Sequence, residues 1–123
     1  MKFTEDSGSG RYRLRGYGEG WIDVDGRRLE QGFILGPDQL VDVWGPAQFS
    51  DLRTEHLEPA FALDADIILI GTGRIQQLPT PAIYRALVRN GTRFELMTTA
   101  AACRTYQVLQ TETRTVVALL FPN

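Results

Sequence analysis

The residues best suited to chemistry stand where two predicted strands end. Gly71-Thr72-Gly73 follows the aliphatic run at 66–70, and Thr98-Thr99 follows the run at 94–97. Ligands commonly bind at the carboxyl ends of parallel strands, and glycines let a ligand approach the backbone closely. A helix that begins after Thr98 would also offer free N–H groups to an anion. The sequence therefore predicts a pocket for an anion or small molecule, formed by Gly71, Thr72, Gly73, Arg74, Thr98, Thr99 and Tyr106.

The same glycines have a purely structural interpretation, because they can simply turn the chain out of a buried strand. The loop lacks the third glycine of a dinucleotide-binding fingerprint and the Gly-Lys-Ser/Thr of a phosphate-binding loop. Residues 74–79 separate it from the next predicted helix start at Thr80. A glycine-rich phosphate cradle normally adjoins a helix N-terminus. Both interpretations stay open at the level of sequence.

The remaining polar residues predict neither a catalytic group nor a metal site. The chain has one Cys and one His, which excludes an internal disulfide and a multi-histidine metal site. Cys103 has no neighbouring histidine or lysine to activate its thiol. His56 lies close to Glu55 and Glu58, as a solvent-facing residue would. We therefore expect no cofactor, no metal and a non-enzymatic role.

Large aromatic residues are concentrated in the N-terminal half, where some must belong to the core. If Trp21 or Trp44 faces solvent, either side chain could anchor a protein partner. Arg11, Arg13 and Arg15 alternate with smaller or apolar residues and would share one strand face. Such a face is typical of a solvated strand, or of an edge that charge protects from pairing.

Hydrophobic alternation predicts β structure across residues 11–47. The Asp25-Gly26 pair is a strong signal for a two-residue hairpin turn. The expected strands are 11–16, 21–24, 27–35 and 40–44.

From Ser50 onward the pattern changes to alternating helices and strands. A short helix is expected from Ser50 to about Leu57, limited by Pro59, and a second begins at Thr80-Pro81 and stops at Gly91. A third covers 99–111, and buried strands are expected at 66–70, 94–97 and 115–121. This order predicts right-handed crossovers onto one largely parallel sheet, so the fold class is α/β.

Composition narrows the function classes. Hydrophobic residues make up 43% and charged residues 23% of the 123 residues, and the net charge is −2. A charge of this size does not favour nucleic acid or an anionic membrane. The apolar runs are far shorter than the ~20 residues of a membrane span, and the polar start predicts no secretory signal. We expect a cytoplasmic protein with a flexible arm at 1–10 and a single domain at 11–123.

Several short motifs occur in a fixed order along the chain: Gly71-Thr72-Gly73, Pro79, Gly91-x-x-Phe94-Glu95-x-Met97-x-Thr99 and Ala101-x-Cys103-x-Thr105-Tyr106. With these motifs the sequence resembles a small family of uncharacterised α/β domains that includes a mitochondrial complex I assembly factor and the adipogenesis-associated domain protein. The resemblance extends from about Tyr12 to Phe121 and is most specific over 91–117.

This resemblance implies a three-layer domain with a central mixed sheet, helices on its faces and a β-hairpin element alongside. It also implies a non-enzymatic assembly role through contact with an unidentified protein partner, and the absence of a targeting extension suggests the bacterial branch. Self-association is left open. The alternative is a small-molecule or anion-binding domain, or an enzyme, with its pocket at the ends of strands 66–70 and 94–97.

Overall fold

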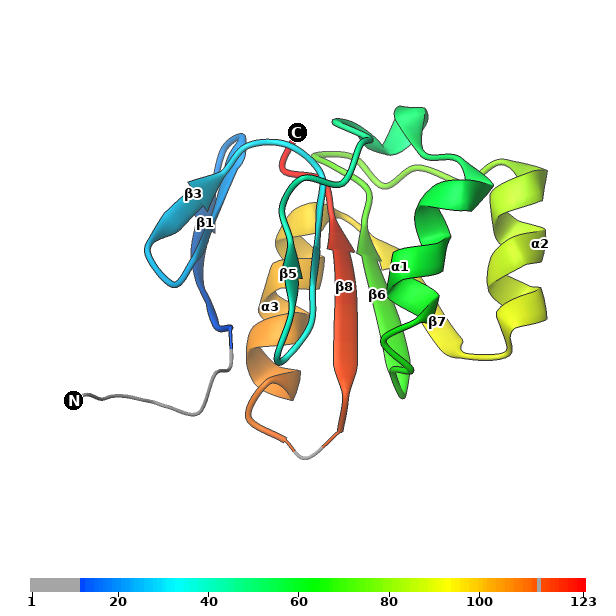
Figure 1. Cartoon of the computed structure of the whole chain (residues 1–123). Coiled ribbons are helices and arrows are strands. Elements are labelled where there is room, and N and C mark those ends of the chain that lie inside the picture. The colour runs from blue at the N-terminus through cyan, green and yellow to red at the C-terminus, as the bar shows by residue number, and fades with distance from the viewer. Residues whose placement is uncertain (1–11, 113) are drawn as a thin grey trace.

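The computed structural model describes residues 12–112 and 114–123, which form three layers (Figure 1). A five-stranded sheet is the middle layer. One helix and a small N-terminal sheet cover one of its faces, and shorter helical segments together with a second helix cover the other. The predicted α/β class, with helices on the sheet and an N-terminal hairpin element, is confirmed. The predicted arm at 1–10 lies outside the described residues.

The N-terminal sheet is antiparallel, with strand order β1-β2-β3. Its strands are β1 (Leu14–Gly18), β2 (Trp21–Val24) and β3 (Arg27–Leu29). The turn between β2 and β3 is the predicted Asp25-Gly26, and both residues have a positive φ, of 51° and 90°. A hairpin turn of this type requires positive φ at both central positions, which explains why this dipeptide is there.

The central sheet is mixed, with strand order β5-β4-β8-β6-β7. Its strands are β4 (Phe33–Leu35), β5 (Leu40–Val41), β6 (Ile67–Gly71), β7 (Arg93–Met97) and β8 (Val116–Leu120). β6 pairs in parallel with both β7 and β8, whereas β4 runs antiparallel to β8 and to β5. Figure 1 shows β8 and β6 in the middle, with the N-terminal sheet on one side and α2 on the other.

The predicted return strand at 27–35 is wrong as a single element. Its first part, β3, belongs to the N-terminal sheet and its second part, β4, belongs to the central sheet. The chain crosses between them at Gly32, where an added Cβ would lie 2.3 Å from the carbonyl oxygen of Pro46 and 2.7 Å from the Phe121 ring. Packing against these distant residues separates the two strands.

Two predictions for the segment between residues 40 and 61 are wrong. The strand expected at 40–44 ends at Val41. The helix expected over 50–57 is instead two 3₁₀ turns, η1 (Phe49–Asp51) and η2 (Thr54–Leu57), followed by α1 (Glu58–Phe61). Leu52 has extended backbone and so interrupts the helix, while Pro59 sits in the first turn of α1, where its missing N–H is not needed.

The two long helices begin where the sequence predicts, and α2 also ends there, whereas α3 ends at Leu109, two residues before the predicted end. The Thr80 hydroxyl caps α2 (Pro81–Asn90) by accepting from the Ile83 N–H, and Gly91 ends this helix with φ 83°. The α3 helix (Thr99–Leu109) is capped by Thr98, whose hydroxyl accepts from the N–H of Ala101. These helices carry the chain from β6 to β7 and from β7 to β8.

Alternate residues of the buried strands face two separate cores. Ile67 and Leu69 of β6 pack with α3 and the N-terminal sheet. Ile68 and Ile70 pack instead with the layer that contains η1, η2, α1 and α2. The continuous aliphatic run is therefore needed, because both faces of the strand are buried.

Candidate functional site

Thr72 lies at the end of β6 and is fully buried. Its hydroxyl is shared between the carbonyl oxygens of Ile75 and Met97, at 3.1 and 3.3 Å, and accepts from the Gln77 N–H at 3.0 Å. The Gln77 side chain in turn donates to the Thr72 carbonyl at 2.8 Å. These bonds use the hydroxyl within the protein and fix the loop from 72 to 77 onto the end of β7.

Thr99, at the start of α3, joins the ends of two strands. Its hydroxyl donates to the carbonyl oxygen of Phe121 at 2.6 Å and accepts from the Gly73 N–H at 2.8 Å. Gly71 has no room for a side chain, since a Cβ would lie 2.9 Å from the Thr99 Cα. Gly73 has φ 115°, and its Cβ would lie 2.5 Å from the Asn123 carbonyl oxygen. Both glycines therefore permit close packing of protein against protein.

The hydroxyls of Thr72 and Thr98 do not converge on a common cleft. Thr72 is buried and hydrogen-bonded to its own loop, and Thr98 caps α3. A pocket that relies on both hydroxyls as ligand donors would have to break these bonds. The geometry instead gives the two threonines structural roles.

Three of the predicted pocket residues do line one shared groove, of about 310 Å³, between the β1–β2 turn and the start of α3. They are Gly73, Arg74 and Thr99. The Arg74 Nη1 lies 3.8 Å from Oε2 of Glu19, which also lines the groove, so an anion at Arg74 would compete with this carboxylate. Both side chains are exposed, so this ion pair itself adds at most about 1 kcal/mol of stability.

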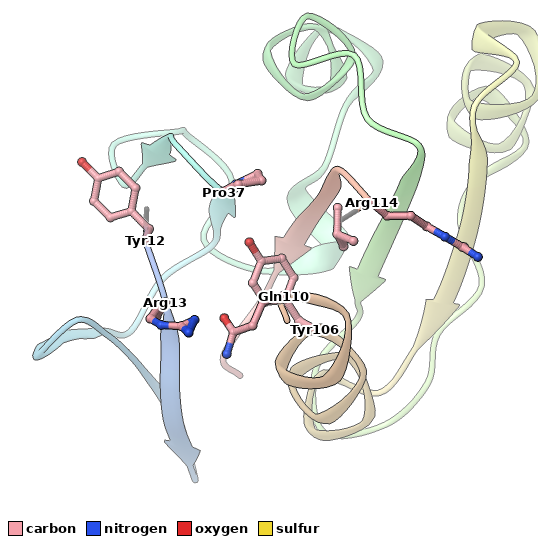
Figure 2. Close-up of a pocket in the computed structure, with 7 residues that line it drawn as sticks. Tyr12, Arg13, Pro37, Tyr106, Gln110 and Arg114 are labelled. Carbon is pink, nitrogen blue, oxygen red and sulfur yellow. The ribbon is translucent and has the colours of Figure 1, made fainter. Parts of the chain in front are cut away.

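Tyr106 lies away from this groove, towards the other end of α3. Seven residues of helix, about 10 Å, separate it from Thr99. It is buried and lines a cavity of about 10 Å³, room for about one water, together with Arg13, Gln110 and Arg114 (Figure 2). The Gln110 side chain bonds the N–H and carbonyl of Leu14, so this cavity marks the seam between β1 and α3.

The two predicted interface tryptophans are each packed against their own chain and half-buried. The Trp21 ring covers Gly18, and the guanidinium carbon of Arg28 lies 3.9 Å from the centre of that ring. The Trp44 Nε1 donates to the carbonyl of His56 at 2.9 Å, and its ring lies 5.5 Å from that of Phe121. Both rings have their main contacts inside the fold.

The thiol and the imidazole also have structural surroundings. Cys103 is fully buried, and desolvation raises its pKa to about 12, so the thiol is protonated and unreactive at neutral pH. His56 accepts from the Arg53 N–H through Nδ1 at 2.9 Å and caps η2. Within residues 12–112 and 114–123, no three His, Cys, Asp or Glu side chains cluster as metal ligands would.

Sequence reasoning missed the most exposed apolar residues of the strand-end region. Ile75 and Leu78 are 75% and 87% exposed on the loop that Thr72 fixes. Beside Leu78 lies a hollow of about 200 Å³ between η1 and α2, whose floor includes Phe49, Leu52 and Ile83. The available signal was the run 74–79, which has aliphatic residues but neither helical nor strand periodicity.

The relatives of this chain include proteins named for assembly and for membranes. It is 30% identical over 105 residues to "NADH dehydrogenase [ubiquinone] 1 alpha subcomplex assembly factor 3" of Xenopus tropicalis, covering 75% of this chain and 57% of that protein. It is 35% identical over 69 residues to the "13 kDa major membrane protein" of Francisella tularensis, 56% of each. The chain thus spans little more than half the length of these curated relatives.

A solved structure supports the same fold. The crystal structure of a Bordetella parapertussis protein matches with a TM-score of 0.84 and 33% identity, covering 95% of this chain and all of the other. In the described part of the chain, no helix has the length and apolar character to cross a membrane. The model of a family described as "Protein of unknown function (DUF498/DUF598)" matches residues 14–121, so the chain belongs to this family.

Proposed function

We propose that this chain is a non-enzymatic protein-binding domain that acts as an assembly factor for a respiratory complex. The observation that carries the proposal is the loop after β6, which presents Ile75 and Leu78 to solvent while Thr72 holds its backbone in place. The relative named as a complex I assembly factor suggests which assembly this domain serves.

Two physical effects favour binding at this loop: burial of its apolar side chains and a backbone that is already ordered. Burying a leucine or isoleucine side chain contributes about 1.5–3 kcal/mol, so two such residues can anchor a contact. Because Thr72 and Gln77 already hold the loop, little further ordering is needed when a partner binds. The hollow beside Leu78 offers a place for an apolar side chain of that partner.

The test is complementation in cells that lack this protein. We expect less assembled complex I on native gels, restored by the wild-type chain but not by an Ile75→Ser, Leu78→Ser double variant. Val43→Ser is the matched control, because Val43 is 92% exposed on a different loop. Crosslinking and mass spectrometry should recover complex I subunits with the wild type. Full rescue by the double variant would contradict the role of this loop, and unchanged complex I in the deletion strain would contradict the assembly role.

The groove at Gly73, Arg74 and Thr99 supports a second candidate function, small-molecule or anion binding. Its volume of about 310 Å³ suits a small metabolite. Titration with inorganic phosphate and simple carboxylates, followed through the amide NMR signals of Gly73 and Ala100, tests this candidate. Saturable shifts confined to the groove would favour it, and unchanged spectra would remove it for these probes.

A cytoplasmic location belongs to the same proposal. Fractionation of cells should place the chain with the cytoplasmic proteins, whereas the name of the Francisella relative leads to the opposite expectation. Recovery in the membrane fraction that resists a salt wash would contradict a cytoplasmic location.

A further inference from the structure

Strand β7 forms one outer edge of the central sheet and pairs only with β6 among the described strands. The Met97 carbonyl points inward, where it accepts from the Thr72 N–H. Along a strand, the N–H and carbonyl of successive residues point alternately to the two sides. Those of Phe94 and Leu96 therefore point outward, away from β6. The Gln76 side chain confirms this direction, because it donates to the Leu96 carbonyl at 3.2 Å. The outward peptide group of Phe94 is thus placed to pair with another strand.

The two faces of this edge differ in chemistry. Arg93 and Glu95 lie on the face opposite to Phe94, with Nη2 and Oε2 3.6 Å apart and both side chains exposed. On the other face, Tyr84 of α2 packs edge-on against Phe94 with ring centres 6.0 Å apart. Val88, one helical turn further along α2, is 53% exposed, as is Tyr84. The edge therefore carries one charged and one apolar border.

We propose that two copies of this chain associate through antiparallel pairing of their β7 edges, with a two-fold axis at Phe94. The N–H and carbonyl of Phe94 would then bond those of the partner's Phe94. This register places Arg93 opposite the partner's Glu95, and Glu95 opposite the partner's Arg93. The same two residues make both ion pairs, as a self-complementary two-fold interface requires.

The charges select this register over its neighbours. Outward-pointing peptide groups recur at every second residue. A pairing that uses the peptide group of Phe94 can therefore also have its two-fold axis at residue 93 or at residue 95. An axis at Glu95 would oppose two carboxylates, and an axis at Arg93 would oppose two guanidinium groups. Like charges directly opposite destabilise a strand pair, whereas opposite charges stabilise it. Only the axis at Phe94 among these three matches positive with negative.

Neighbouring residues limit the length of the paired strand segment and add apolar contacts to it. Gln76 covers Leu96, and Gly91 ends α2 just before the strand, so the pairing is short and centred on Phe94. On the apolar border, Tyr84 and Val88 of both copies would lie beside the two Phe94 rings and lose exposed area. Charged residues usually protect an edge strand from other strands. Here the same charges would exclude foreign strands while admitting a second copy.

Charge reversal tests this interface on the full chain, with molecular mass followed by sedimentation over a range of concentrations. The wild type should dimerise, more weakly at high salt. Glu95→Arg should lower the association constant by about tenfold or more, because two attractive pairs become repulsive. Glu19→Arg is the matched control, since it makes the same charge change on the distant β1–β2 turn and should leave the dimer intact.

The decisive experiment mixes two variants of opposite charge. Arg93→Glu should also associate weakly by itself, but an equal mixture with Glu95→Arg should form a heterodimer, because the two acids of one chain then face the two bases of the other. Circular dichroism and thermal melting should show that each variant is folded. A wild type that stays monomeric at several hundred micromolar, a dimer insensitive to Glu95→Arg, or a mixture that does not associate would each overturn the proposal.

Discussion

The end of β6 and the outer edge of β7 lie in neighbouring strands, yet they use their polar residues in opposite ways. At the end of β6, the hydroxyl of Thr72 is buried and bonds only to its own loop and to β7. At the edge of β7, the side chains of Arg93 and Glu95 are 67% and 45% exposed. A residue type that suggests chemistry therefore predicts a binding site only where its polar atoms are still available.

The aromatic and aliphatic residues show the same difference. Trp21 and Trp44 look like interface anchors by residue type, but their rings pack against Gly18 and Phe121 of the same chain. Ile75 and Leu78 belong to no motif and are far more exposed. The end of β6 is thus organised by internal contacts, whereas the loop with Ile75 and Leu78 and the edge of β7 are exposed to a partner. Four variants test this difference.

Gly73→Val should have the largest effect. Its φ of 115° disfavours any residue with a Cβ, and the Cβ would lie 2.5 Å from the Asn123 carbonyl oxygen. We expect a loss of about 3 kcal/mol or more in the free energy of unfolding, measured by urea denaturation. Gly16→Ala is the control, because nothing lies within 4 Å of its Cβ position. Equal stability of the two variants would show that the end of β6 is not tightly packed.

Thr72→Val should cost about 1–3 kcal/mol, because the nearly isosteric change removes the hydroxyl that bonds the Ile75 carbonyl and the Gln77 N–H, and leaves the Met97 carbonyl with the Thr72 N–H alone. Hydrogen exchange of the Gln77 amide should also become faster. Thr72→Ser retains the hydroxyl and should lose clearly less stability. If Val and Ser variants are equally stable, the hydroxyl does not hold the loop.

Cys103 lies in α3 and is another polar group that the fold buries. Its pKa is about 12 in the folded chain against an ordinary value of 9.0, because burial favours the neutral thiol. The unfolded chain therefore loses this proton first, and stability that is complete below pH 9 should fall between pH 9 and 12 by up to about 1.4 kcal/mol per pH unit. Denaturation of Cys103→Ala between pH 8 and 11 should show a shallower decline than the wild type. Parallel declines would mean that other groups account for the dependence.

The smallest stability effect is expected for Ile75→Ser combined with Leu78→Ser. Both side chains are exposed, so the free energy of unfolding should change by no more than about 0.5 kcal/mol per residue. Thermal melting of the isolated chain measures this. A large loss would show that these residues stabilise the fold itself, and it would weaken their proposed role in binding a partner.

Much of the fold could be predicted because its signals are local. The aliphatic run at 66–70, the Thr80-Pro81 start and Gly91 stop of α2, and the Asp25-Gly26 turn all depend on residues within a few positions of one another. The split of 27–35 into two strands could not be predicted, because the contacts at Gly32 come from Pro46 and Phe121. The interruption at Leu52 also escaped, since many residues adopt either helical or extended backbone.

The candidate site was less predictable for the same physical reason. The sequence by itself determined which strands are buried on both faces, where the long helices begin, and which residues could act as donors at the strand ends. The tertiary structure alone decided which donors are already engaged: Thr72 meets the Met97 carbonyl and Thr99 meets the Phe121 carbonyl, each more than twenty residues away. Hydrogen bonds and burial join residues that are distant in sequence, so no local pattern reveals which polar groups remain free.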